Sequence, residues 1–123
     1  MHSKDRLSTV ADTDTIMMVE RITAAIVEHI HPLKVILFGS FAKGSYTEDS
    51  DYDIYLVVKD ETNIAASTDE AYHAVLDIKD RPVDIIVGTE SSFEQKSRDA
   101  ASLMIEAEVY RTGILIYDRM EGQ

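Results

Sequence analysis

The sequence contains no cysteine among its 123 residues, so neither a disulfide framework nor a zinc–thiolate site can contribute to the fold. Basic residues are also few: 12 Lys and Arg stand against 23 Asp and Glu, giving a net charge of −11. Because neutralisation of phosphates by Lys and Arg dominates nucleic-acid binding, direct binding to nucleic acid or copying of a template is not expected. The acidity instead suggests, as a hypothesis, electrostatic attraction to a basic protein partner.

Long apolar runs are missing as well. The first six residues carry no apolar signal core, and no run approaches the length of a membrane span. We therefore expect no membrane contact and a cytoplasmic location. Hydrophobic residues make up 45% of the chain, enough for one core, and we predict a single domain over 1–123 with its core at about 14–118 and loose ends.

Strand-like and helix-like patterns alternate along the chain. Capping-box patterns at 67–70 and 91–94 predict two helix starts, and Gly113 predicts a helix end. The predicted strands are 33–38, 51–59, 82–87 and 114–117, and the predicted helices are 14–30, a turn after 39, a helix from 67, and a stretch from 91 to 112 that breaks near 99. This order predicts an α/β (α+β) fold, a small mixed β-sheet with helices packed mainly on one face.

Three acidic residues lie where strands are predicted. Asp51 and Asp53 open the apolar run 54–58, and Asp84 lies within the run 83–87. Alternate residues of a strand share a face, so Asp51 and Asp53 point to one side while Ile54 and its alternates point to the other. Charged groups in strands bound for a core are costly unless they are paired or bind a metal.

Carboxylate oxygens suit Mg²⁺, which completes its shell with water and substrate phosphates. Gly39-Ser40 ends the first predicted strand and offers a small-residue turn that can approach phosphates. Two Mg²⁺ ions held by Asp51, Asp53 and Asp84 would neutralise a triphosphate and support an in-line displacement. The implied chemistry is nucleotidyl transfer.

Two other motifs overlap this region. Asp49, Asp51 and Asp53 have the spacing of the first EF-hand ligands, but Ile54 and Asp60 stand where that loop needs Gly and Glu. Gly39 and Gly44 have P-loop spacing, but Ser45 stands where its Lys belongs. Both interpretations are therefore disfavoured.

Gly39-Ser40, then ten residues, then Asp51-Tyr52-Asp53 resembles the signature of the DNA polymerase beta-type nucleotidyltransferase superfamily. Residues 33 to 117 are similar to its stand-alone minimal nucleotidyltransferases. The resemblance implies the nucleotidyltransferase fold, with metal binding by Asp51 and Asp53. It also implies that Asp84 completes the catalytic ion's shell and helps to deprotonate the acceptor. Gly39 and Ser40 would hold the triphosphate of ATP. Lys43 replaces the family's usual Arg and can act as a point charge towards phosphate.

Minimal nucleotidyltransferases of this kind commonly occur as antitoxins beside a HEPN ribonuclease toxin. The resemblance implies Mg²⁺-dependent transfer of AMP from ATP to a tyrosine of that toxin, which neutralises it. No second domain for gripping an acceptor is evident, which favours a protein acceptor. The alternatives are a non-catalytic nucleotide-binding module that acts by contact and a small-molecule nucleotidyltransferase.

Overall fold

The computed structural model describes residues 1–99 and 103–120. Their strands are β1 (Lys34–Phe38), β2 (Tyr52–Val58), β3 (Val83–Thr89) and β4 (Ile114–Asp118). A 3₁₀ turn at Lys4–Arg6 precedes the helices, which are α1 (Leu7–Val10), α2 (Thr13–Ile30), α3 (Gly39–Lys43), α4 (Ile64–Val75), α5 (Glu90–Ser97) and α6 (Ile105–Thr112). The predicted strands and the helical turn after residue 39 are confirmed.

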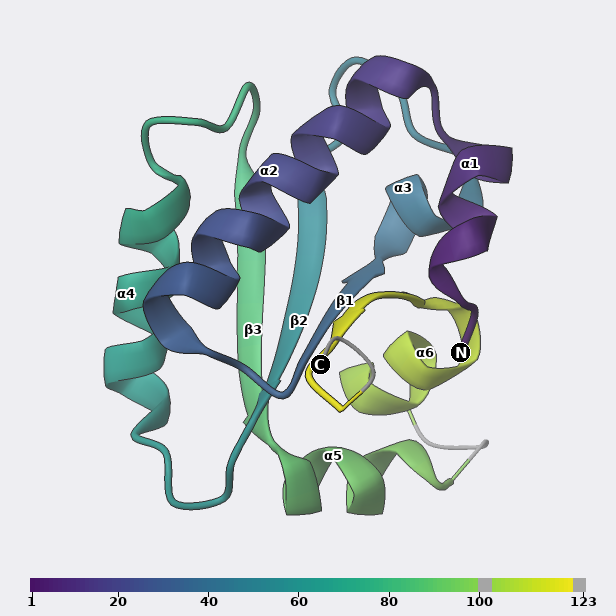
Figure 1. The fold of residues 1–123 in the computed structure, drawn as a ribbon. Helices are drawn as coiled ribbons and strands as arrows, with labels where there is room; N and C mark the ends of the chain where they lie inside the picture. Colours follow the sequence, from purple (N-terminus) through teal and green to yellow (C-terminus); the bar gives the residue numbers. More distant parts are fainter. Residues whose placement is uncertain (100–102, 121–123) are drawn as a thin grey trace.

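The described strands form one mixed sheet in the order β3-β2-β1-β4. β1 runs antiparallel to β2 and β4, whereas β2 and β3 are parallel and are joined through α4. The end of β1 and the starts of β2 and β3 therefore lie at the same end of the sheet (Figure 1).

The larger part of the core lies between the sheet and the helices α2 and α4, which cover the near face in Figure 1. The helices contribute Ile22 and Val75, and the sheet contributes Leu37, Ile54 and Leu56. All five side chains are at most 2% exposed, which agrees with the amphipathic pattern of 14–30.

The opposite face is partly covered by α5 and α6. Tyr55 packs there with Phe93 of α5, with ring centroids 5.2 Å apart. Its hydroxyl donates a 2.8 Å hydrogen bond to Glu106 of α6 in a buried setting. A Cβ at Gly88 would overlap the Tyr55 hydroxyl, so glycine leaves the space that this ring needs. The predicted α/β fold with a small mixed sheet is confirmed; α2 and α4 cover one face, and the shorter helices α5 and α6 pack on the other.

Both predicted capping boxes are wrong. α4 begins at Ile64 because Asn63 accepts a hydrogen bond from the amide of Ala66, and Ser67 is buried inside the helix. α5 begins at Glu90, capped by Thr89 through the amide of Ser92. Earlier Asx or Thr side chains thus took the capping role.

The first residues of the chain are part of the fold, contrary to our expectation of a loose end. His2 bridges to Ile114 of β4, and Leu7 is 1% exposed within the main core. The apolar side chains of α1 account for this, since they fill space beside α3. The other expected loose end, after residue 118, falls largely outside the described residues. Within the described part of the chain, no helix has the length and apolar character needed to cross a membrane.

Candidate functional site

Strand pairing brings the predicted site residues to one end of the sheet. Phe38, immediately before Gly39, pairs with Asp53 across the antiparallel β1–β2 ladder. Asp53 pairs with Asp84 across the parallel β2–β3 ladder. The register thus places the Gly39 turn, Asp53 and Asp84 side by side from three strands.

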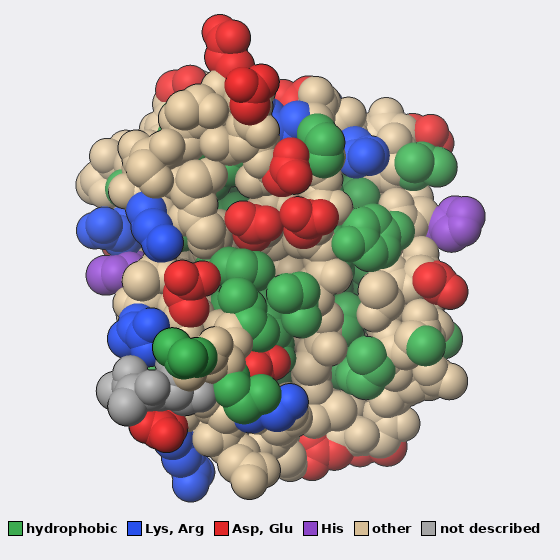
Figure 2. Space-filling view, turned by 180° about the vertical axis from the view of Figure 1, so that it is seen from behind, with side chains coloured by type: hydrophobic (Ala, Val, Ile, Leu, Met, Phe, Trp, Pro, Cys, Tyr) green, Lys and Arg blue, Asp and Glu red, His purple; other side chains and the backbone are tan. Residues whose placement is uncertain are grey.

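Asp53 lies on the predicted face of β2. Asp53 alternates with Ile54, which belongs to the main core, and shares its side of β2 with Tyr55 in the second cluster. Asp51 immediately precedes β2. Figure 2 shows the side of the molecule opposite α2 and α4. On this side, acidic side chains gather above a group of hydrophobic ones.

Asp84 differs from our expectation of a charge inside the core. Its side of β3 is exposed, whereas Val83 and Ile85 on either side are buried. β3 is an edge strand and α4 covers only its other face. Asp84 is therefore open to solvent and to a substrate.

Gly39 lies directly against Asp53. Its φ angle is 72°, which favours glycine. A Cβ at this position would overlap Asp53 Oδ2 and lie 3.1 Å from Cγ. The absence of a side chain lets the turn between β1 and α3 approach the carboxylate. Ser40, which follows in the first turn of α3, is half-buried.

The environment of Asp53 disfavours its charge. Burial, followed by the charges of Asp84, Asp51 and Glu108, raises the pKa of Asp53 to about 6, while Lys43 opposes the shift. A bound cation would relieve this repulsion, and the carboxylate oxygens fit a hard ion such as Mg²⁺. Within 1–99 and 103–120, no group of three His, Cys, Asp or Glu side chains is gathered closely enough to hold a metal. The ligand set Asp51, Asp53 and Asp84 therefore stays a prediction.

Lys43 ends α3 and faces an acidic residue that the sequence did not single out. Its Nζ lies 3.7 Å from Oε1 of Glu108 on α6. Both side chains are nearly half exposed. Glu108 lies 57 residues after Asp51 in an ordinary amphipathic helix, so no local motif could have indicated it.

Arg81 is the second residue that sequence reasoning missed. Its Nη1 faces the carbonyl oxygens of Thr47, Glu48 and Ser50, at 3.2, 3.5 and 3.2 Å. Its guanidinium also lies over the Phe41 ring, 5.2 Å from the centroid. Arg81 thus fixes the loop that joins α3 to Asp51. The only local signal was a cation just before the predicted strand 82–87.

The structure forms neither of the two alternative motifs, the EF-hand loop and the P-loop. Asp53 lies in an extended strand, which cannot wrap an ion as an EF-hand loop does. Gly44 ends the five-residue α3, so Gly39 and Gly44 do not form a P-loop before a long helix.

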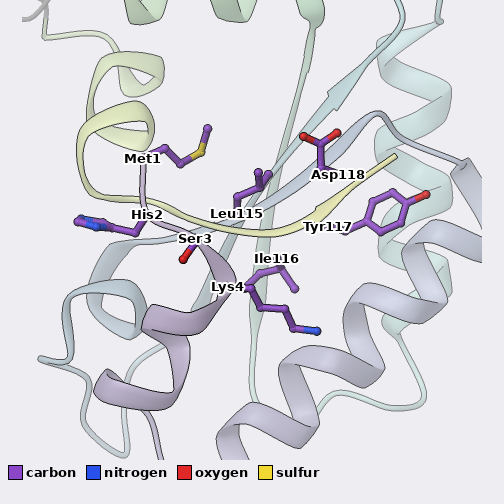
Figure 3. A pocket seen from close by; sticks show the side chains of 8 residues that line it. All are labelled: Met1, His2, Ser3, Lys4, Leu115, Ile116, Tyr117 and Asp118. Atoms are coloured by element: carbon purple, nitrogen blue, oxygen red, sulfur yellow. The ribbon is translucent and has the colours of Figure 1, made fainter. Parts of the chain in front are cut away.

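A hollow in the surface lies elsewhere. It measures about 430 Å³ and is formed by the first four residues and β4 (Figure 3). None of the predicted site residues lines it. The candidate site residues lie instead at the end of the sheet.

Two solved structures share this fold. The first is described as a putative nucleotidyltransferase from Sulfolobus solfataricus. It has 23% identity and a TM-score of 0.51, with 90% of this chain and 92% of that chain covered. The second is described as a toxin-antitoxin with AMP-PNP. It has 20% identity and a TM-score of 0.60, with 84% of this chain and 75% of that chain covered.

A protein of Methanocaldococcus jannaschii, named "Putative protein adenylyltransferase MJ0604", is 67% identical over 24 residues. This match spans 20% of the chain and 24% of that protein. A much longer match is to the family model described as "Polymerase beta, Nucleotidyltransferase", which covers residues 20–122. The chain therefore belongs to the polymerase beta nucleotidyltransferase family.

Proposed function

We propose that the protein is a Mg²⁺-dependent nucleotidyltransferase that transfers AMP from ATP to a tyrosine of a partner protein. We further propose that it is an antitoxin and that the partner is a HEPN ribonuclease toxin, neutralised by this modification. The observation that carries the proposal is the Asp53 carboxylate, held against the Gly39 turn among like charges. A carboxyl whose pKa is raised by burial and by neighbouring charges is a candidate for a functional site.

In this proposal each site residue has a definite task. Asp51 and Asp53 hold Mg²⁺, and Asp84 completes the shell of the catalytic ion. The Gly39–Ser40 turn receives the phosphates at the start of α3, with Lys43 as a nearby positive charge. When bound, the ions would neutralise the triphosphate and lower the pKa of the attacking hydroxyl.

The proposed reaction is an in-line displacement. The tyrosine oxygen forms a bond to the α-phosphorus of ATP, and the bond from that phosphorus to the bridging oxygen breaks. Pyrophosphate leaves, and the hydroxyl proton passes to the exposed carboxylate of Asp84. Its exposure at the sheet edge supports this role, because a protein-borne tyrosine can reach it.

The nature of the acceptor is inferred from surface properties. The net charge of −11 disfavours RNA or DNA as an acceptor. The candidate site residues lie at the end of the sheet, where Asp84 is exposed to solvent. Both features favour an acceptor presented by another protein, and the names of the two relatives that mention protein adenylylation and toxin–antitoxin pairing agree with this choice.

The test uses ATP labelled at the α-phosphate, incubated with Mg²⁺, the protein and a host lysate. The comparison is Asp51→Asn/Asp53→Asn, and the control is Asp49→Asn, which removes an exposed charge from the same loop. We expect a labelled protein band with the wild type and the control and none with the double variant. The label identifies nucleotidyl transfer, because transfer of the γ-phosphate would leave no α-label on protein.

Two outcomes would replace the proposal. One outcome is nucleotide binding without any labelled product, with the partner neutralised by the wild type and by the double variant alike. It would identify a module that acts by contact. A labelled small molecule without a labelled protein would identify a small-molecule nucleotidyltransferase. Phosphoamino-acid analysis of the labelled band checks the tyrosine, and mass spectrometry of that band identifies the partner.

A further inference from the structure

The ion pair between Lys43 and Glu108 joins two elements across the candidate site. Lys43 ends α3, four residues after Gly39, and Glu108 lies on α6. α3 begins at Gly39, whose turn lies directly against Asp53. The pair is therefore close to the place where phosphates would bind under the proposed function.

The position of Glu108 is fixed by the packing of α6. Two residues before it, Glu106 is 6% exposed and accepts the buried hydrogen bond from Tyr55. One residue after it, Val109 is fully buried in the second core cluster. Tyr55 lies on β2 two residues after Asp53, so the same strand positions Asp53 and, through Glu106, the helix that carries Glu108. The carboxylate of Glu108 is thus directed at α3 by a packed helix.

The ion pair between Lys43 and Glu108 is of a kind that another anion can replace. The 3.7 Å separation exceeds ordinary hydrogen-bond length, and both side chains are nearly half exposed. Pairs of this kind contribute little net stability, because solvent screens them. A polyphosphate carries more negative charge than one carboxylate and would compete effectively for the ammonium group of Lys43.

We propose that Glu108 is an internal competitor of the nucleotide: it holds Lys43 while the site lacks nucleotide and loses it to the triphosphate on binding. This inference rests on the proposed function, since it requires a nucleotide at the Gly39–Ser40 turn. Glu108 is a positioning residue in this scheme and takes no part in the chemistry. Its effect is to weaken nucleotide binding in the wild type.

The test measures the binding of Mg²⁺–AMP-PNP, a non-hydrolysable probe, by titration calorimetry at low salt. The proteins are the wild type, Glu108→Gln, Lys43→Met and the double variant. Glu94→Gln is the matched control, because it removes an exposed charge from the neighbouring helix α5. We expect Glu108→Gln to tighten binding by roughly fivefold, the order of an exposed ion pair, and Glu94→Gln to leave it unchanged. In the Lys43→Met background the gain from Glu108→Gln should largely vanish.

The outcomes distinguish a failure of the competition by Glu108 from a failure of the proposed function. Equal tightening in both backgrounds, or no tightening in either, overturns the competition between Glu108 and the nucleotide while leaving the nucleotide site intact. A wild type that does not bind Mg²⁺–AMP-PNP overturns the proposed function, and the competition with it. Circular dichroism of each variant checks that the fold is retained.

Discussion

Replacing Asp53 by asparagine is expected to stabilise the metal-free protein while abolishing AMP transfer. The wild-type carboxyl lies beside Gly39 and near the charges of Asp84, Asp51 and Glu108. Asparagine has nearly the same shape and carries no charge, so the packing against Gly39 is kept and the repulsion is removed. The site would thus gain stability and lose a group on which the proposed chemistry depends.

The size of the effect follows from the shift in pKa. The pKa of Asp53 rises from 3.8 to about 6, and one pH unit corresponds to about 1.4 kcal/mol. The upper bound is therefore about 3 kcal/mol at neutral pH. Asp53 is only partly buried, and solvent screening reduces the expected gain to about 1.5 kcal/mol.

The effect has a defined dependence on pH. Below pH 3.8 the carboxyl of Asp53 is protonated in both the folded and the unfolded protein and makes no difference. Between pH 3.8 and about 6 the unfolded chain releases the proton first, so this group lowers the free energy of unfolding as the pH rises. Above about pH 6 the contribution of Asp53 to the free energy of unfolding no longer changes with pH. The advantage of Asp53→Asn should therefore appear over this window and then stay constant.

The measurement is urea unfolding in EDTA at pH 4, 5, 6 and 7.5, with Asp49→Asn as the charge control. The variant should gain on the wild type from pH 4 to 6, and the control should show a smaller and flatter difference. Addition of Mg²⁺ should stabilise the wild type more than Asp53→Asn, because a cation compensates the same repulsion. A variant that is less stable than the wild type at pH 7.5 without metal would show that the carboxylate is not under electrostatic strain.

Three further perturbations test other contacts. Gly39→Ala should lower the free energy of unfolding by about 1–3 kcal/mol and abolish AMP transfer, because the new Cβ would meet Asp53 and the φ of 72° disfavours alanine. A fully active variant would refute the close approach of Gly39 to Asp53. Arg81→Ala should lose about 1–3 kcal/mol of unfolding free energy, and limited proteolysis should cut within 44–51, whereas an uncut loop would show that other contacts hold it. Tyr55→Phe should lose about 1–3 kcal/mol in urea unfolding, because Glu106 keeps a buried carboxylate without its donor; wild-type stability would indicate that water replaces the hydroxyl.

Sequence reasoning placed the candidate residues on neighbouring strands because their positions follow short-range rules. The alternation around Asp53 fixed its face, and the spacing from Gly39–Ser40 to Asp51 indicated which strand end carries the turn. Asp84 was placed on the correct strand, but its exposure depends on the edge position of β3, which only the strand order reveals. Site geometry was thus predictable within strands and less so between them.

The residues that were missed act across large separations in sequence. Arg81 contacts carbonyl groups 31 to 34 residues earlier in the chain, and Glu108 meets Lys43 through the packing of α6. The starts of α4 and α5 were misplaced for a different reason. Asn63 and Thr89 are also favourable capping residues and precede the serines, and the fold decided between the competing signals.

The parallel pairing of β2 and β3 has a consequence for the order in which the protein becomes functional during synthesis. A ribosome that has released β1 and β2 has already made Gly39, Asp51 and Asp53, but Asp84 and the strand that carries it arrive only after α4 is complete. Glu108 and α6 follow later still. Short nascent chains therefore lack the complete candidate site, and under the proposed function nucleotide would be captured only by a chain long enough to have assembled the sheet.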